Sequence, residues 1–236
     1  MMAAPPFAID PEIATVVLAL ADDELVIGHR HSEWLGLSPF LEEDLAMASI
    51  AQDEFGHARA LYALLWPSWV ERDARVVQRP PSAFRSCALV ELDARPWEQH
   101  LLRHVLYDVV EGHRWRSLAE AAIAPLAAIA ERAMVEERWH RRHATDLLGR
   151  LAPGHRWRFQ VQLDALWPLV GALMDGLADQ ECRTALNDLR GVLLDLGLHV
   201  DEINVAALDR LGRSAAFVEV HRSLGEVMDI DPDATW

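Results

Sequence analysis

The sequence predicts an all-α protein built on a four-helix bundle, with additional helices after the bundle. Two observations lead to this fold class: apolar residues recur at helical spacing in four long stretches, and Gly and Pro, 12 of each, gather mainly between such stretches. The alternation of apolar and polar residues that is typical of strands is missing. Because 51% of the 236 residues are hydrophobic and 25% are charged, we expect one globular domain over residues 1–236.

The first predicted hairpin joins helices over about 11–34 and 40–66. Pro11 suits the first turn of a helix, and Asp10 before it is a favourable capping residue. The break between the two helices is expected at residues 36–39, with the sequence GLSP.

The second predicted hairpin joins helices over about 97–123 and 126–151, and Pro153-Gly154 is expected to end the later helix. Residues 68–96 separate the hairpins. This stretch is long for a loop, so we expect it to carry a short helix. Further helices are predicted after the bundle, as additional C-terminal elements, over about 157–177, 180–197, 201–212 and 215–228.

The charge and the apolar pattern exclude several classes of function. The formal net charge of −15 disfavours binding to nucleic acid and to anionic membrane surfaces, because both need a basic protein face. No apolar run reaches the roughly 18 residues of a membrane span, and the first residues lack the pattern of a signal peptide. The two cysteines form no CxxC pair. We therefore expect a soluble, cytoplasmic protein.

A Glu-x-x-His motif occurs twice within the predicted helices, as Glu54 with His57 and as Glu137 with His140. Residues three apart share one face of a helix, so both side chains of a pair can bind one ion. In each helix the pair lies in the apolar stripe that should face the bundle core. A bare carboxylate is costly to bury, and a cation is the simplest compensation.

Each predicted hairpin supplies one more glutamate opposite its motif. If the two turns centre near residues 38 and 125, Glu24 lies opposite Glu54 and Glu111 lies opposite Glu137. One Glu from each of two helices and Glu-x-x-His from each of the other two is the ligand set of ferritin-like di-iron and di-manganese proteins. The sequence therefore predicts a ferritin-like bundle with a di-metal site made by Glu24, Glu54, His57, Glu111, Glu137 and His140.

The predicted cofactor is a pair of iron ions, with manganese as the alternative, because carboxylates and imidazoles suit both metals. Four glutamates carry four negative charges, which two divalent ions balance, and six ligands leave positions for O2 or water. The four glutamates would act as catalytic residues by holding the metals that activate O2. Three other carboxylates lie where they could orient the ligands: Asp53, Asp108 and Glu136.

The segment from His29 to Leu65, HRHSEWLGLSPFLEEDLAMASIAQDEFGHARALYALL, resembles the phenylacetyl-CoA epoxidase (PaaA/PaaC) family. The likeness is closest to the structural, PaaC-type subunit of that family. It rests on Ser32-Glu33-Trp34, Gly36, Pro39, Leu41-Glu42-Glu43-Asp44, Ala46, Asp53, Gly56 and Ala58-Arg59, and continues more weakly over residues 136–140. That subunit has usually lost its metal ligands, whereas this chain keeps all six. Residues 210–217, RLGRSAAF, also replace a Gly/Lys-rich stretch of the family.

The resemblance implies a subunit of a multicomponent, non-haem di-iron monooxygenase or oxidase of phenylacetate degradation. It implies three kinds of partner: a catalytic ferritin-like subunit or a second copy of this chain, a reductase that donates electrons, and an acyl-CoA or another small aromatic molecule. Two alternatives stay open. The chain could be a non-catalytic scaffold that pairs with a catalytic homologue, or a ferritin-like protein that stores iron or removes peroxide.

Overall fold

The computed structural model describes residues 9–66, 76, 78–201, 210 and 215–230. Over these residues the chain forms helices and turns without any strand, so the predicted all-α, ferritin-like class is confirmed. The fold has two compact units, one up to Asp93 and again from Arg210, the other from Ala94 to Asp209. Each unit contains one of the two predicted hairpins. The expectation of a single domain stays a prediction.

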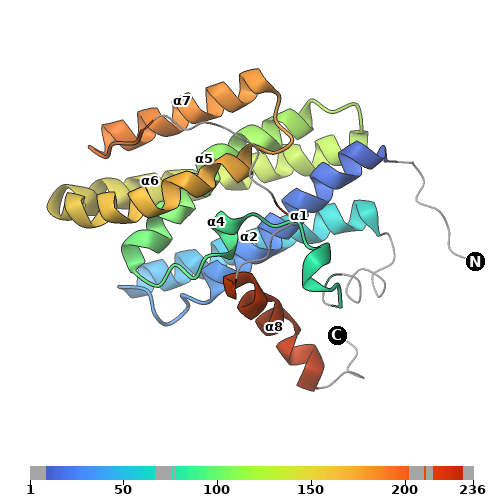
Figure 1. Cartoon of the computed structure of the whole chain (residues 1–236), viewed down its shortest axis with the longest axis horizontal. Coiled ribbons are helices and arrows are strands. Elements are labelled where there is room, and N and C mark those ends of the chain that lie inside the picture. Colours follow the sequence, from blue (N-terminus) through green and yellow to red (C-terminus); the bar gives the residue numbers. More distant parts are fainter. Residues whose placement is uncertain (1–8, 67–75, 77, 202–209, 211–214, 231–236) are drawn as a thin grey trace, which may run out of the picture. The chain divides into compact units, whose positions relative to one another are not determined.

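The first unit is built on helices α1 (Pro11–Ser32) and α2 (Leu41–Leu65), which pack along each other (Figure 1). The start of α1 is as predicted. Pro11 occupies the first turn, and the Asp10 carboxylate accepts a hydrogen bond of 2.9 Å from the backbone N–H of Glu12. This cap satisfies one of the backbone donors that a helix leaves unpaired at its N-terminus.

The turn between α1 and α2 lies where the sequence predicts it. Gly36 has a φ of +78°, a left-handed conformation that favours glycine. Asp44, in the first turns of α2, accepts hydrogen bonds from the backbone N–H groups of Gly36 and Ser38 at 3.0 and 3.1 Å. The turn is therefore held by a side chain of the helix that follows it.

Shorter elements complete the first unit. A 3-10 turn, η1 (Pro81–Ala83), and a short helix, α4 (Ala88–Glu91), follow the hairpin and confirm that residues 68–96 carry a short helix. The last helix, α8 (Ala215–Ile230), packs on α1, α4 and η1 within this unit. It corresponds to the predicted helix over 215–228. The helix predicted over 201–212 lies almost wholly outside the described residues.

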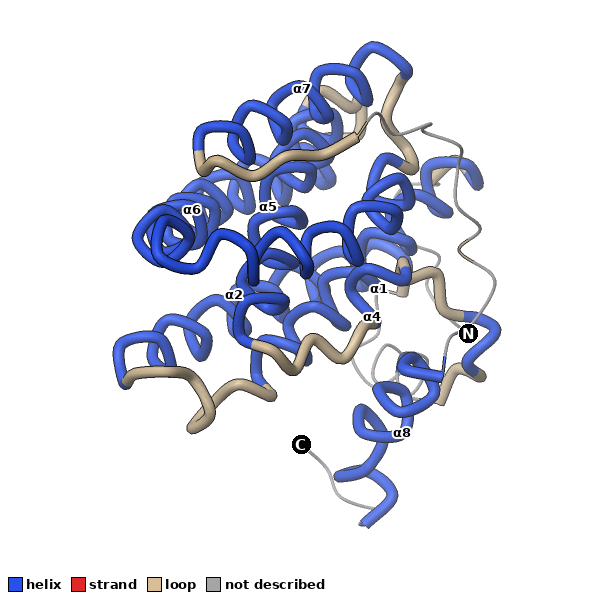
Figure 2. The backbone as a smooth tube through the Cα atoms, turned by 60° about the vertical axis from the view of Figure 1, so that its left-hand side comes forward, coloured by secondary structure: helices blue, strands red, loops and turns tan. Residues whose placement is uncertain are grey.

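The second unit is built on α5 (Trp97–Ala119) and α6 (Ala124–Leu166), which pack along each other (Figure 2). The break predicted at Pro153-Gly154 is present as a kink within α6. The chain kinks at His155, where φ is −138° and ψ is 27°, and then continues helically. A proline removes one helical hydrogen bond, which accounts for a kink here. Side chains on both sides of the kink are buried: Leu148, Ala152, Phe159 and Leu163.

The helix predicted over 157–177 is therefore the end of α6 followed by the 3-10 segment η2 (Trp167–Met174). Helix α7 (Asp179–Asp195) agrees with the helix predicted over 180–197 and packs on α5. Across the described parts of the chain, no helix is both long and apolar enough to cross a membrane.

One segment of α1 and one segment of α5 consist of buried residues only, and both segments carry predicted ligands. Residues 19–24 of α1 and residues 100–111 of α5 are all buried, so these segments have no solvent-exposed face. A helix that is buried all round belongs to the interior of the protein. Each polar side chain on these segments must therefore find its partner inside the molecule.

Candidate metal centre

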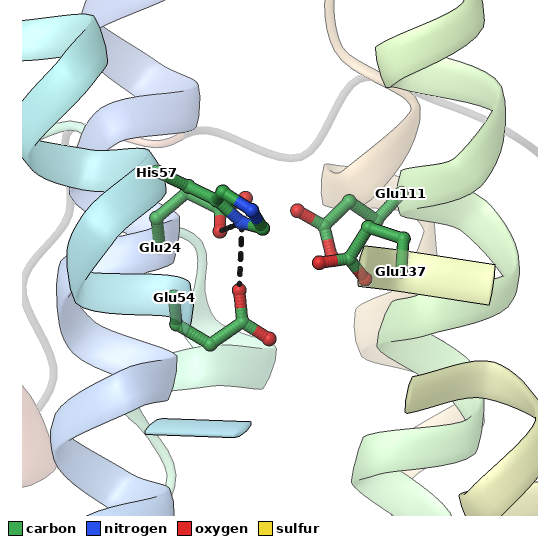
Figure 3. A group of neighbouring side chains, drawn as sticks. All are labelled: Glu24, Glu54, His57, Glu111 and Glu137. Atoms are coloured by element: carbon green, nitrogen blue, oxygen red, sulfur yellow. Dashed lines mark hydrogen bonds and ion pairs between the residues drawn. The ribbon is translucent and has the colours of Figure 1, made fainter. Parts of the chain in front are cut away.

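The first half-site consists of Glu24 on α1 and of Glu54 and His57 on α2. Both glutamates are fully buried and His57 is 4% exposed. The Nδ1 atom of His57 lies 3.3 Å from Oε2 of Glu24 and 3.4 Å from Oε2 of Glu54 (Figure 3). The hairpin thus brings together the three residues that the sequence predicts for it, and their ligand atoms lie within 4.8 Å of one another.

The second half-site consists of Glu111 on α5 and of Glu137 and His140 on α6. All three side chains are buried, with exposed fractions of 0%, 3% and 4%. Glu111 and Glu137 offer carboxylate oxygens within 4.8 Å of each other, and Nδ1 of His140 lies 3.2 Å from Oε1 of Glu137. In both half-sites the same ring nitrogen, Nδ1, faces the glutamate of the Glu-x-x-His motif.

The donor set of each half-site fits a divalent metal ion. Two ligands that each lie about 2.1 Å from one ion, at roughly a right angle, are about 3 Å apart. The observed separations of 3.2–3.4 Å between Nδ1 and the carboxylate oxygens are close to this value. Within each trio a protonated imidazole would balance only one of two carboxylates, whereas a divalent cation balances both. Two carboxylates and one imidazole suit Fe or Mn better than Zn, which favours thiolates or more imidazole.

The neighbours of Glu24 on α1 are two buried aspartates that arginines neutralise. The Asp22 carboxylate accepts hydrogen bonds from the guanidinium of Arg79, from the hydroxyl of Tyr62 and from the backbone N–H of Arg85. Burial and the adjacent Asp22 carboxylate raise the pKa of Tyr62 well above its ordinary value. Burial lowers the pKa of Arg79, but Asp22 and Tyr62 together outweigh burial and the net shift of this pKa is upward. Tyr62 therefore stays protonated and Arg79 stays charged.

Asp23 has a second arginine. Both of its carboxylate oxygens accept from Nη1 of Arg210, at 3.0 and 2.9 Å, and Oδ1 also accepts from the backbone N–H of Cys87 at 2.8 Å. Arg210 donates to the carbonyl of Arg85 as well, at 2.8 Å. These bonds attach Arg210 and the segment after η1 to the helix that carries Glu24.

The surroundings of Glu111 on α5 are different. The indole N–H of Trp115, one turn later, donates to Oε1 of Glu111 at 2.8 Å, and Trp115 is fully buried. One turn in the other direction, Oδ2 of Asp108 lies 2.9 Å from Nε2 of His104, and this pair is also buried. Asp108 thus contacts His104, and the predicted role of Asp108 in orienting a ligand stays a prediction.

The two remaining predicted orienting residues lie beside the motif glutamates and are half-buried. Glu136 accepts hydrogen bonds of 3.3 Å from Nε and Nη2 of Arg132, four residues earlier on α6. Asp53 lies on α2 next to Glu54. That either carboxylate holds an imidazole N–H stays a prediction.

Three residues around the half-sites were not predicted from the sequence: Trp115, Asp22 and Asp23. Trp115 follows Glu111 by four residues, the spacing at which helical side chains meet, so this contact could have been found from the sequence. The pair Asp22-Asp23 stands with Glu24 between two apolar runs, a pattern that indicates burial. Its arginine partners are distant in the sequence, and no local pattern indicates them.

The model of the family described as "Phenylacetic acid catabolic protein" matches residues 4–191, which include both half-sites. The chain belongs to this family. One member that it resembles is a 1,2-phenylacetyl-CoA epoxidase subunit, the one designated C, from Escherichia coli (strain K12), with 30% identity over 189 residues. The match covers 78% of this chain and 75% of that relative. The resemblance predicted from residues 29–65 is therefore confirmed, both for the family and for its PaaC-type branch.

Proposed function

We propose that this family member is a subunit of a phenylacetyl-CoA epoxidase-like multicomponent monooxygenase and that its two half-sites together hold a carboxylate-bound di-iron site. The observation that carries the proposal is the repeated trio. In each hairpin, Nδ1 of a buried histidine faces the carboxylate of a buried glutamate at 3.2–3.4 Å, at the separation expected for two ligands of one ion. Membership of a family of phenylacetic acid catabolism supports the reaction class.

In this proposal four glutamates and two histidines bind the ions, and a bound pair of iron ions supplies the redox chemistry that activates O2. The chain itself provides the environment. The buried segments of α1 and α5 keep bulk water away from the ligands, which strengthens their electrostatic attraction to the ions. Arg79 and Arg210 neutralise the two aspartates beside Glu24, so the ions need to balance only the ligand carboxylates.

The proposed partners are a catalytic ferritin-like subunit, or a second copy of the chain, and a reductase that delivers electrons. The proposed substrate is an aromatic acyl-CoA. That the similar Escherichia coli protein is named as one subunit of an epoxidase supports assembly with other subunits. Exposed apolar side chains at the turn between α1 and α2 offer surface for such contacts: Leu35, Leu37, Phe40, Leu41 and Leu45, with exposed fractions of 42–68%.

Metal content tests the proposal directly. We expect about two iron ions per chain after growth with ample iron and anaerobic purification. The variants His57→Ala and His140→Ala remove the imidazole of one half-site each, so each should lose at least about one ion. His113→Ala is the matched control, because His113 is also buried and lies on α5 but faces Asp188. It should keep the wild-type iron content. Less than about a tenth of an ion of iron and manganese together per wild-type chain would rule out the site.

The scaffold alternative stays open, because the similar Escherichia coli protein is named only as one subunit of an epoxidase. Glu54→Ala separates the alternatives when the chain is produced together with the catalytic homologue of its genome. Loss of turnover with an intact complex indicates an oxygenase site in this chain. Unchanged turnover indicates a scaffold, and loss of folding indicates a structural metal. The iron-storage alternative predicts a large shell, which light scattering distinguishes from a dimer.

A further inference from the structure

Trp115 stands out among the tryptophans because its polar atom bonds to a proposed metal ligand. Its indole Nε1–H donates to Oε1 of Glu111 at 2.8 Å, and the whole side chain is buried. An indole N–H can only donate, and it has no charge with which to neutralise the carboxylate. The bond therefore orients Glu111 while leaving its negative charge for a cation.

The equivalent position in the first half-site has no side chain. Glu111 and Trp115 are four residues apart, and the residue four positions after Glu24 is Gly28. A Cβ atom at Gly28 would come within 3.0 Å of Cβ of Glu54 and within 3.2 Å of the ring of Phe55. Because α2 occupies this space, an indole could not be placed there. The two half-sites thus have the same types of ligand residue but differ in the contacts that hold these residues.

We propose that Trp115 is a positioning residue that fixes the carboxylate of Glu111, so that the second half-site presents a preset oxygen to its ion. Oε1 accepts the indole hydrogen bond, and Oε2 is then the oxygen best placed to bind the metal. Fixing a ligand before the ion arrives lowers the entropy that binding costs. Loss of such a supporting hydrogen bond typically weakens metal binding by about 10- to 100-fold. This inference rests on the proposed di-metal site.

The test is a titration of the metal-free full-length chain with Co²⁺, followed by calorimetry and by the visible absorbance of the bound ion. Trp115→Phe keeps an aromatic ring but removes the N–H. We expect one of two binding steps to weaken about tenfold, with a changed Co²⁺ spectrum for that ion, and the other step to be unaltered. The spectrum reports coordination, which a merely structural role of Trp115 would not change.

Trp167→Phe is the matched control. Trp167 lies in the same unit, is 6% exposed, and its indole donates to the backbone carbonyl of Asp201 at 3.0 Å. Its replacement also removes one indole hydrogen bond, and both Co²⁺ steps should stay as in the wild type. The positioning role is refuted if circular dichroism shows that Trp115→Phe is folded and this variant binds two Co²⁺ ions with the affinities and the visible spectrum of the wild type. If the wild-type chain binds no Co²⁺, the di-metal site itself fails, which is a different outcome.

If Trp115→Phe does not fold, Trp115→His serves as the second variant, because a neutral imidazole can still donate one N–H. Binding restored toward the wild-type value supports positioning by a hydrogen bond. The NMR spectrum of the imidazole shows whether the ring introduced at position 115 bonds to a carboxylate. If the folded Trp115→His chain binds both ions with wild-type affinity without such a bond, the positioning role is contradicted.

Discussion

The two half-sites carry the same ligands in different surroundings. On α1 the residues before the ligand are Asp22 and Asp23, which arginines neutralise, whereas the corresponding residues on α5 are Val109 and Val110, which are fully buried. The first ligand helix is therefore held by ion pairs to segments outside its hairpin. Around its ligand the second has buried valines at these positions, and Trp115 of the same helix bonds to Glu111. A ligand set can therefore be repeated within one chain while the interactions that support it are not.

The largest effect should come from Asp22→Ala. This change leaves the guanidinium of Arg79 buried without its carboxylate, and removing one partner of a buried ion pair typically costs about 3–5 kcal/mol. Val109→Ala, at the corresponding position of α5, should cost only about 1–3 kcal/mol, because it removes two methyl groups. The measurement is the free energy of unfolding from urea denaturation.

The double variant Asp22→Ala, Arg79→Leu provides the control. Because Arg79→Leu removes the guanidinium that lost its carboxylate partner, the double variant should be more stable than Asp22→Ala alone. If Asp22→Ala and Val109→Ala lowered the free energy of unfolding equally, the buried ion pair would stabilise α1 no more than apolar packing stabilises α5. The contrast between the two ligand helices would then fail.

The next effect concerns the close approach of α1 and α2. Gly28→Ala places a methyl group 3.0 Å from Cβ of Glu54, an atom fixed to the helix backbone that cannot move away by rotation. Overpacking of this kind costs typically 1–3 kcal/mol, whereas alanine gains about 0.5–1 kcal/mol of helix propensity. We expect a net loss of roughly 1–2 kcal/mol, measured as a lower midpoint of thermal unfolding.

Gly56→Ala on α2 is the control for Gly28→Ala. A Cβ atom at this exposed position meets nothing within 4 Å, so only the propensity gain remains and the midpoint should rise. If Gly28→Ala also raised the midpoint, the two helices would not be in tight contact at Glu54.

The ligands and the four long helices were predictable because both depend on local spacing. Glu54 and His57 lie three residues apart within an apolar stripe, and Glu24 was found by folding the hairpin about its turn. The cap at Asp10 and the turn at Gly36 follow equally local rules. These features need no knowledge of distant parts of the chain.

The supporting contacts were not predictable because they join distant residues. Arg79 and Arg210 are 57 and 187 residues from the aspartates that they neutralise, and nothing near them in the sequence marks them as buried. The break near Pro153, by contrast, follows from a local rule, because a proline interrupts the hydrogen bonds of a helix, and the chain is non-helical at His155 close by.

The smallest effect should come from an ion pair near the surface of the second unit. Asp188 on α7 accepts hydrogen bonds of 3.0 and 3.1 Å from Arg141 and one of 3.1 Å from His113, and a third of its side chain is exposed. Burial raises the pKa of Asp188, but the bonds from Arg141 and His113 outweigh burial, so the pKa falls below 3.8. The carboxylate therefore binds protons less readily in the folded chain than in the unfolded chain.

A lowered carboxylate pKa contributes stability above the unfolded value of 3.8, and this contribution is lost as the pH falls through the folded value. Asp188→Asn should thus cost about 0.2–1 kcal/mol near neutral pH, a magnitude that solvent screening limits, and the difference from the wild type should shrink to nothing in acid. Asp146→Asn is the control, because Asp146 is 56% exposed and lies 3.6 Å from an exposed Arg142, so its effect should be too small to measure. The measurement is the free energy of unfolding in urea of the wild type and both variants, from neutral pH down through the acid range. A loss for Asp188→Asn larger than that for Asp22→Ala would reverse the contrast, since it would make a solvent-screened ion pair stronger than a buried one.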